Sequence, residues 1–299
     1  MDPPKTSLPV PLRPVESGAV AGTLYVVSTP IGNLDDLTFR AAKVLREVDA
    51  VLAEDTRRTR QLLSHLGISK PLRRFDAHAE AGAVERVARE VAEGATLALV
   101  SDAGTPVISD PGADLVRATV AAGGQVVAIP GASAVLTALV ASGLAGGGFR
   151  FFGFVPRSGE ARAEVLARIV ETPEPVVLYE AGNRTGDTLA ELAARAADRP
   201  AVVARELTKL HEELVRGSLR ELAERYAGEE PRGEVTVVLG AAPARVETVD
   251  DAAIDARIDA ELASGRSAKD TADVVAAWSG RARREVYARV VSHRTKARG

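Results

Sequence analysis

The segment LYVVSTPIGNLDD, residues 24–36, decides the fold of this chain. It begins with a short apolar run, typical of a buried strand, and passes at once into the turn-rich TPIGN. After the turn, Asp35 and Asp36 are expected to cap a helix whose apolar residues recur at helical spacing from Leu37 to Val48. A buried strand followed by a helix is the repeating unit of a parallel α/β sheet.

The same unit recurs through the first half of the chain. The predicted strands cover residues 24–28, 50–53, 96–100 and 125–129. Further helices are predicted near residues 80–93, 113–122 and 133–142, and a polar segment follows residue 53. Short buried strands that alternate with helices indicate a parallel sheet covered on both faces.

A glycine-rich linker, GLAGGG at residues 143–148, divides the chain near its middle. The strands predicted after it cover residues 149–155, 176–179, 201–204, 213–216 and 234–239, and the helices cover 161–170, 186–197 and 218–226. Some connections here are too short to contain a helix, so this half is expected to be more mixed in strand direction.

Beyond a second linker at residues 241–250 the pattern becomes wholly helical. A helix capped by Ser267 should end near Trp278, and Ser279-Gly280 should turn into a last helix. In that last helix, four residues are expected to face inward: Val286, Tyr287, Val290 and Val291. Two helices joined by a tight glycine turn, with several arginines, are compatible with a helix-turn-helix.

The sequence therefore predicts four regions. These are a proline-rich, disordered tail at residues 1–21, two α/β domains at 22–142 and 143–240, and a basic helical extension at 251–299.

Composition narrows the class of protein. The 299 residues are 46% hydrophobic and 26% charged, which is typical of a soluble globular protein of about two domains. The absence of cysteine excludes disulfides, iron–sulfur clusters and cysteine nucleophiles, and it suits a reducing cytoplasm. No apolar run approaches the ~18 residues of a membrane span.

The net charge of −3 hides an uneven distribution. Residues 265–299 contain nine Lys and Arg against three Asp and Glu, so the rest of the chain is strongly acidic. A basic terminal segment on an acidic body suggests a polyanionic partner, and a solvated helical tail is the simpler alternative.

Unusual clusters follow four of the predicted strands at their carboxyl ends, where open parallel sheets bind ligands. These clusters are TPIGNLDD (29–36), EDTRRTR (54–60), SDAGTP (101–106) and PGASA (130–134). One such cluster is most simply a turn, but four on consecutive strands indicate a site. Small residues let the backbone approach a ligand, and Glu54, Asp55 and Asp102 are expected to point into the same crevice.

Several common sites are missing from the sequence. It contains no G-x-G-x-x-G after the first strand, no phosphate-binding G-x-x-x-x-G-K-[ST] and no G-x-S-x-G. The four histidines are not paired at ligand spacing, which disfavours a transition-metal site.

Five motifs in order resemble the signature set of one family. They are TPIGNL (29–34), AEDTR (53–57), SDAGTP (101–106), YE (179–180) and RELTK (205–209). The set is similar to that of the tetrapyrrole methylase superfamily, the class III S-adenosylmethionine-dependent methyltransferases, in the branch that modifies small-subunit ribosomal RNA. Two positions depart from the family pattern: PGASA replaces the expected Pro-Gly-Pro-x-Ala, and His78 stands alone where relatives often have two histidines.

The resemblance implies two α/β domains of tetrapyrrole-methylase type, with S-adenosylmethionine in the cleft between them and a small helix-turn-helix-like module after them. It assigns these residues to the cofactor: Pro30, Ile31, Gly32, Asp102, Ala103, Gly104, Thr105, Ile108, Ser133, Ala134, Tyr179, Glu180, Val235 and Thr236.

By the same resemblance, the reaction is 2′-O-methylation of a cytidine ribose in small-subunit (16S) ribosomal RNA, free or in the assembled subunit, by a cytoplasmic homodimer without metal. The candidates for the base, or for positioning groups around it, are Glu54, Asp55, His78 and Lys209. Ion pairs with neighbouring arginines are the structural alternative for this group.

Basic residues should line the approach of the RNA. The candidates are Arg57, Arg58, Arg60, Arg184, Arg281 and Arg284. Two other functions remain open: a methyltransferase of the same fold acting on a tetrapyrrole or other small molecule, and a non-catalytic RNA-binding assembly factor. The basic C-terminal helices disfavour the first of these.

Overall fold

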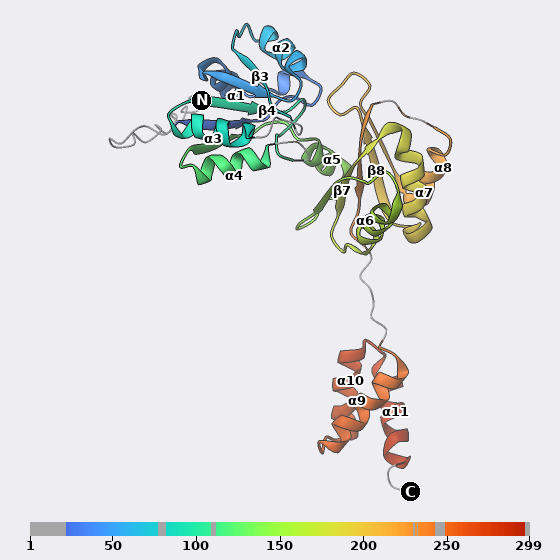
Figure 1. The fold of residues 1–299 in the computed structure, drawn as a ribbon. Helices are drawn as coiled ribbons and strands as arrows, with labels where there is room; N and C mark the ends of the chain where they lie inside the picture. Colours follow the sequence, from blue (N-terminus) through green and yellow to red (C-terminus); the bar gives the residue numbers. More distant parts are fainter. Residues whose placement is uncertain are drawn as a thin grey trace, which may run out of the picture. The chain divides into compact units, whose positions relative to one another are not determined.

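The computed structural model describes residues 22–76, 82–108, 112–229, 231, 233–242 and 249–296. The chain forms two compact units, Met1–Ala242 and Pro243–Gly299, which are described separately (Figure 1). The tail expected at residues 1–21 lies outside the described residues.

The first unit begins with a five-stranded sheet in the order β3-β2-β4-β1-β5. Its strands are β1 (Thr23–Val27), β2 (Ala50–Ala53), β3 (Leu72–Arg74), β4 (Thr96–Val100) and β5 (Gln125–Ile129). All neighbours pair in parallel, which confirms the expected parallel sheet.

Helices cover both faces of this sheet. They are α1 (Phe39–Glu47), α2 (Thr56–His65), α3 (Ala83–Ala92) and α4 (Ala113–Ala121), with a 3-10 turn, η1, at Leu34–Asp36; α5 (Ala134–Ser142) follows β5. Apolar residues of the strands divide between two core clusters, one around Val27 and Val51 and the other around Leu24 and Leu52. This division is the consequence of side chains that alternate between the faces of a strand.

The polar segment after residue 53 is helix α2 followed by strand β3. The Asp55 carboxylate caps α2 by accepting the Arg57 N–H at 2.8 Å, and Leu62 and Leu63 form a buried face. Arg57, Arg58 and Arg60 lie on the exposed side of this helix. Strand β3 has only three residues, too few to show a pattern in the sequence.

The expected caps of the first helix were also wrong. Thr38 caps α1, since its side-chain oxygen accepts the Ala41 N–H at 3.1 Å, whereas Asp35 and Asp36 lie in the preceding 3-10 turn.

The second sheet has the order β6-β7-β10-β8-β9. Its strands are β6 (Arg150–Phe154), β7 (Val176–Ala181), β8 (Pro200–Arg205), β9 (Glu213–Ser218) and β10 (Glu234–Leu239). The pair β6–β7 is parallel and the others are antiparallel, which confirms the mixed direction expected for this half.

Both faces of the second sheet are also covered. The helices after residue 143 are α6 (Gly159–Glu171), α7 (Thr185–Ala196) and α8 (Leu219–Arg225), with a 3-10 turn, η2, at Gly182–Arg184. They pack on one face of the sheet, and α5 packs on the other through Val135, Ala138 and Leu139. Helix α5 therefore joins the two sheets.

The second compact unit contains three helices, α9 (Asp251–Ala263), α10 (Ala268–Ser279) and α11 (Arg283–Lys296). Gly280, with a φ of 68°, ends α10 in the left-handed conformation and forms the expected tight turn. Ile254, Ile258, Val275, Val286 and Val290 make its core.

Two residues of α11 do not face inward as expected. Tyr287 is 42% exposed and Val291 is 44% exposed. Each follows a buried valine by one position, which rotates it by about 100° around the helix and away from α9 and α10. In the part of the chain that the structure describes, no helix is both long and apolar enough to cross a membrane.

Buried Arg199 ties the far end of the second sheet to α6. Its side chain, in a residue 3% exposed, donates to the carbonyls of Gly240, Ile169, Val170, Thr172 and Glu174 at 2.8 to 3.3 Å. A guanidinium has five N–H donors in a planar fork, and no other side chain could serve these acceptors.

We expect Arg199→Met to lower the free energy of unfolding by about 3 kcal/mol, because it leaves several buried carbonyls without donors. Denaturant unfolding followed by circular dichroism measures this. Arg195→Met, at an exposed position of α7, is the matched control and should change stability by no more than about 0.5 kcal/mol. Equal effects of the two substitutions would contradict the role of Arg199.

Candidate functional site

Three of the motif loops interlock at the carboxyl ends of β1, β4 and β5. Thr29 and Gly104 exchange backbone hydrogen bonds, N–H to carbonyl oxygen, of 2.8 and 3.1 Å. The Thr105 hydroxyl lies 3.0 Å from that of Ser28 and donates to the Ala132 carbonyl at 3.3 Å. Gly104 has a φ of 83°, a conformation that few other residues adopt. The loops thus form one continuous surface, as expected for a ligand site.

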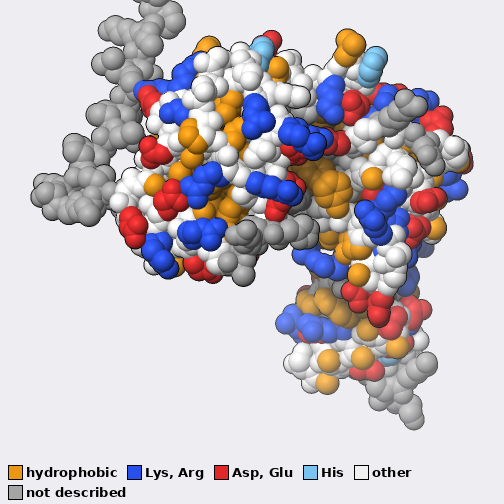
Figure 2. Space-filling model, turned by 45° about the horizontal axis from the view of Figure 1, so that its top comes forward, with side chains coloured by type: hydrophobic (Ala, Val, Ile, Leu, Met, Phe, Trp, Pro, Cys, Tyr) orange, Lys and Arg blue, Asp and Glu red, His pale blue; other side chains and the backbone are white. Residues whose placement is uncertain are grey.

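A cavity of about 270 Å³ lies between this surface and the second sheet, and we name it the interdomain cleft. Its lining residues from the first sheet's side are Ile31, Glu54, Arg58, Asp102, Ala103, Gly104, Thr105, Ile108, Ser133 and Ala134. Those from the second sheet's side are Phe154, Tyr179, Glu180, Glu234, Val235 and Thr236. Figure 2 shows hydrophobic side chains, in orange, in the hollow between the two α/β domains, with Lys and Arg side chains, in blue, near its rim.

All residues assigned to the cofactor line this cleft except Pro30 and Gly32. These two line a neighbouring cavity of about 350 Å³, here the lysine cavity, together with Lys209. A third hollow, here the acidic cavity, is lined by Glu54, Asp55, Thr56, Arg57, Arg74, Asp76 and Asp102. Asp102 borders all three spaces.

The carboxylates at these junctions differ in their electrostatics. Burial, and then the charges of Asp102 and Asp76, raise the pKa of Glu54 above its usual value. The side-chain and backbone hydrogen bonds from Arg57 lower the pKa of Asp55 to about 2. Asp102 accepts the Asp55 N–H at 3.0 Å, and its other oxygen lies 3.6 Å from an Arg58 nitrogen. Glu54 is therefore the better proton acceptor of the first two, while Asp55 is a helix cap.

The RELTK loop (205–209) docks on the TPIGN loop. The Thr208 hydroxyl accepts the Asn33 N–H at 3.1 Å, and a Cβ on Gly32 would come within 2.5 Å of the Lys209 Cγ. Glu206 and Thr208 have positive φ values of 51° and 65°, strain that is typical of functional sites. Lys209 is held by Glu206, whose carboxylate lies 3.0 Å from its Nζ.

Glu180 is fully buried behind the wall of the cleft. Its carboxylate accepts the Thr188 hydroxyl at 2.6 Å and lies 3.3 Å from the Arg184 Nε and 3.9 Å from an Arg162 nitrogen. Arg184, a candidate for RNA contact, also donates to the carbonyls of Val155 and Pro156 at 2.8 and 2.9 Å. Both side chains are thus engaged in holding β7 and the segment after β6 in place.

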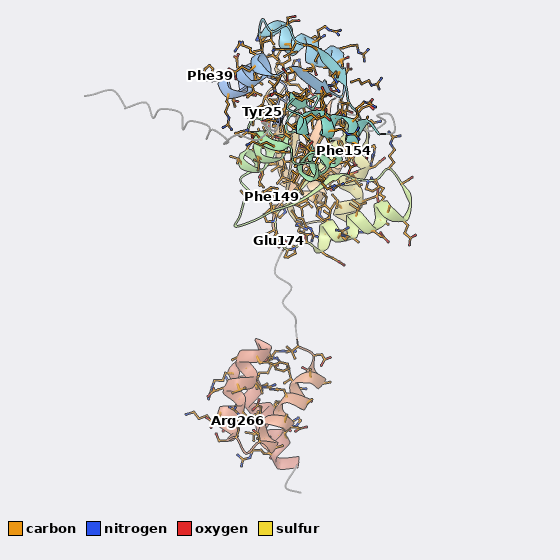
Figure 3. All side chains as sticks on the ribbon, turned by 60° about the vertical axis from the view of Figure 1, so that its left-hand side comes forward. Tyr25, Phe39, Phe149, Phe154, Glu174 and Arg266 are labelled. Carbon is orange, nitrogen blue, oxygen red and sulfur yellow. The ribbon has the colours of Figure 1, made fainter. Side chains whose placement is uncertain are left out.

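Three aromatic residues lie together on the second sheet's side of the cleft, and the sequence predicted only one of them, Tyr179. Phe151 and Phe154 lie 5.0 and 5.2 Å from the Tyr179 ring, between centroids. Phe154 is found where the two α/β domains meet (Figure 3) and lines the cleft. The concentration of four phenylalanines in residues 149–155 was the signal for it.

The remaining candidates fall in different places. His78 lies outside the described residues. Arg57 lines the acidic cavity, and Arg60 lies on the exposed side of α2. Arg281 and Arg284 belong to the separate helical unit, where Arg281 pairs with Asp251 and Glu285.

Comparison with known proteins agrees with this geometry. The model of the family described as Tetrapyrrole (Corrin/Porphyrin) Methylases matches residues 23–223. A relative from Xylella fastidiosa, named Ribosomal RNA small subunit methyltransferase I, is 48% identical over 74% of this chain and 82% of its own length. A relative of the same name from Neisseria meningitidis serogroup A is 39% identical over 95% of this chain and 98% of its own.

Solved structures share the fold at lower identity. A cobalt precorrin-4 methyltransferase has a TM-score of 0.58 at 18% identity, over 76% of this chain and 98% of its own. A uroporphyrin-III C-methyl transferase from Thermus thermophilus, complexed with S-adenyl homocysteine, has a TM-score of 0.54 at 22% identity, over 73% and 97%. The resemblance expected from the motifs is confirmed: the chain belongs to the tetrapyrrole methylase family, in the branch whose relatives carry the ribosomal RNA methyltransferase name.

Proposed function

We propose that this protein uses S-adenosylmethionine to methylate the ribose 2′-oxygen of a cytidine in small-subunit ribosomal RNA. The observation that carries the proposal is the interdomain cleft, since four of the five motifs that carry the resemblance contribute residues to it. The name of the relatives supports ribosomal RNA as the substrate.

The residues of the cleft suit the methyl donor. Ile31, Ala134 and Val235 offer apolar surface, and Tyr179 and Phe154 an aromatic one, for the adenosine part. Gly104 has no side chain, so the donor can approach the backbone of this loop closely. The Asp102 carboxylate favours the positive charge of the donor at the point where the cleft meets the two neighbouring cavities.

Glu54 suits the role of general base. It borders both the interdomain cleft and the acidic cavity, so a ribose in that cavity would face the donor. When bound, S-adenosylmethionine supplies a methyl group carried on a cationic sulfur, and the sulfur departs as a neutral thioether once the methyl group is transferred. As the 2′-oxygen bonds to the methyl carbon, the Glu54 carboxylate accepts the 2′ proton, and most of the remaining catalysis is positioning.

Cations surround the openings through which RNA would enter. Arg57 and Arg74 are exposed on the acidic cavity, and Arg58 lies between the cleft and the lysine cavity. Lys209, an ammonium held by Glu206, serves as a contact for phosphate or ribose and not as a base. A nucleotide must leave its stack to place its ribose here, so the target is an unpaired segment.

We further propose that the enzyme is a cytoplasmic homodimer. Helix α5 carries apolar residues on both its inner and its outer face, and on the outer face Leu136 and Val140 are 53% and 77% exposed. A helix that is apolar all round is normally buried, which supports a second copy as its cover. A ribosomal RNA substrate and a chain without cysteine support the cytoplasm.

The central test is methyl transfer from isotopically labelled S-adenosylmethionine to small ribosomal subunits, followed by mass-spectrometric mapping of the ribose. We expect one labelled cytidine with wild-type protein and none with Asp102→Leu, which should still bind RNA while its donor affinity falls by at least tenfold. Asp102→Asn keeps an oxygen for the Asp55 N–H and is the matched control for folding. Unlabelled RNA, with label in a small tetrapyrrole instead, would show that the substrate is wrong.

Replacement of Glu54 by Gln should lower kcat by about 100-fold or more with little change in donor affinity, because a general base contributes about that much. Because the pKa of Glu54 is raised, its carboxylate takes up a proton at a higher pH than an ordinary glutamate does as the solution is acidified. The protonated form cannot act as a base. Wild-type activity should therefore fall on acidification with an apparent pKa above the usual Glu value of about 4.3. Glu54→Gln should lose this acidic limb, and Glu47→Gln, at an exposed site on α1, should keep it. An unchanged limb in Glu54→Gln would assign the base elsewhere.

Lysine at both Leu136 and Val140 should convert the dimer to a monomer, because two charges cannot be buried at an apolar contact without a partner. Sedimentation velocity measures the mass. Phe39 is 99% exposed at the outer side of the first domain (Figure 3), and Phe39→Lys is the control that should remain dimeric. A wild-type monomer, or a dimer that survives both lysines, would refute the α5 contact.

A further inference from the structure

The arginines of the C-terminal helical unit fall into two classes. On the side toward α9, Arg281, two residues before α11, lies 3.3 Å from an Asp251 carboxylate oxygen, and Arg289 of α11 lies 3.0 Å from the same atom. His293 follows on this side, with its Nδ1 2.7 Å from Asp259 and its Nε2 3.0 Å from an Asp255 oxygen. The hydrogen bond from Arg289, together with its charge and that of His293, lowers the pKa of Asp255. Acidic α9 thus neutralises this face of α11.

Other arginines of the unit are paired as well. Arg283 contacts Asp273 of α10, and Arg257 and Arg266 each lie 2.7 Å from an oxygen of Glu261. Much of the positive charge after residue 265 is therefore neutralised by ion pairs within the unit. Within the described ranges, Arg284 and Arg294 are the arginines of α11 without an ion pair.

These two arginines lie on one stripe with two other exposed side chains. Arg284, Tyr287, Val291 and Arg294 follow one another at spacings of three and four residues, which places them on one face of the helix. Tyr287 and Val291 each follow a buried valine, Val286 and Val290, by one position and so lie about 100° farther around the helix. We name this face the outer stripe of α11. The stripe carries no acidic residue, and its arginines are about 15 Å apart along the helix axis.

The chemistry of the outer stripe fits RNA. Exposed guanidinium groups bind phosphate oxygens in pairs of hydrogen bonds, and an exposed tyrosine ring stacks on an unpaired base. One aromatic residue between two cations, with an apolar neighbour in Val291, is suited to a short single-stranded segment whose base turns toward the protein. A duplex would present phosphates and sugars but no free base face to Tyr287.

We propose that the outer stripe of α11 binds single-stranded RNA, with phosphates on Arg284 and Arg294 and a base on Tyr287. The inference rests on the proposed function in one respect, that the substrate is RNA. The ion-paired arginines, Arg281 among them, hold the three helices together and present the stripe, and they are not the RNA contacts.

The test measures binding of a single-stranded small-subunit ribosomal RNA fragment to the full chain over a range of salt concentrations. Removal of two phosphate contacts in Arg284→Gln/Arg294→Gln should reduce the slope of log affinity against log salt by about 1.4, at ~0.7 per contact. Affinity at low salt should fall about tenfold. Tyr287→Ala should also weaken binding about tenfold but leave the slope unchanged, because stacking involves no counterion release.

Arg266→Gln/Arg283→Gln is the matched control, since it removes the same charge from ion-paired arginines of the same unit. Arg266 and Arg283 are about half exposed, and the buried Glu261 keeps its second partner, Arg257, so this variant should fold, and its salt slope should equal that of wild type. Equal losses in the two double variants, or no loss in Arg284→Gln/Arg294→Gln, would overturn the proposal. So would weaker binding to assembled small subunits with unchanged binding to the naked fragment, which would indicate a protein partner.

Methyl-transfer kinetics separate this inference from the proposed function. The stripe variants should raise KM for RNA about tenfold while kcat and the affinity for S-adenosylmethionine stay at wild-type values. If the wild-type protein methylates RNA and a stripe variant has an unchanged KM, RNA binding by the stripe is refuted and the proposed function is not. If the wild-type protein binds the fragment through the stripe but transfers no methyl group to RNA, the proposed function is refuted and RNA binding by the stripe is not.

Discussion

The packing of α5 between the two sheets is the contact on which the site depends. The first turn of this nine-residue helix belongs to the loop surface of the first sheet, with Ser133 as its cap and a lining residue of the cleft. Farther along, Val135, Ala138 and Leu139 pack against Val177, Val202 and Val238 of the second sheet. Because one short helix begins in the loop surface of the first sheet and packs on the second sheet, apolar packing sets the distance between the walls of the cleft.

Around that contact, the motif loops have divided roles. The loops after β1, β4 and β5 hold one another by backbone hydrogen bonds and leave few side chains on the surface that meets a ligand. The RELTK loop closes the opposite side by docking on Gly32. Behind the second sheet's wall, Glu180 joins Thr188 and Arg184, so the polar groups nearest the cleft are fully paired. Glu54 and Asp102 are the carboxylates that line both the interdomain cleft and the acidic cavity.

Charge is organised differently in the two compact units. In the first, arginines gather beside carboxylates at the cavity openings, where Arg57 and Arg74 each pair with a neighbouring aspartate and remain exposed. In the second, the acidic residues of α9 pair with Arg281 and with Arg289 and His293 of α11, and Asp273 of α10 pairs with Arg283. A count of charges along the sequence could not separate these cases, because it does not show which carboxylate faces which guanidinium.

The sequence by itself determined the parallel first sheet, the mixed second sheet and the positions of the motif loops, because strand and helix periodicity and turn residues are local properties. It also pointed to the residues of the interdomain cleft, since the loops of a parallel sheet must meet at one edge. Only the tertiary structure decided that the arginine-rich segment after residue 53 is helix α2, and that Tyr287 and Val291 face outward. It alone separated Glu54, whose pKa is raised, from Asp55, whose pKa is lowered, and, among the described residues, the unpaired Arg284 from the ion-paired Arg281. Burial, ion pairing and pKa depend on neighbours distant in the sequence, and the fold brings those neighbours together.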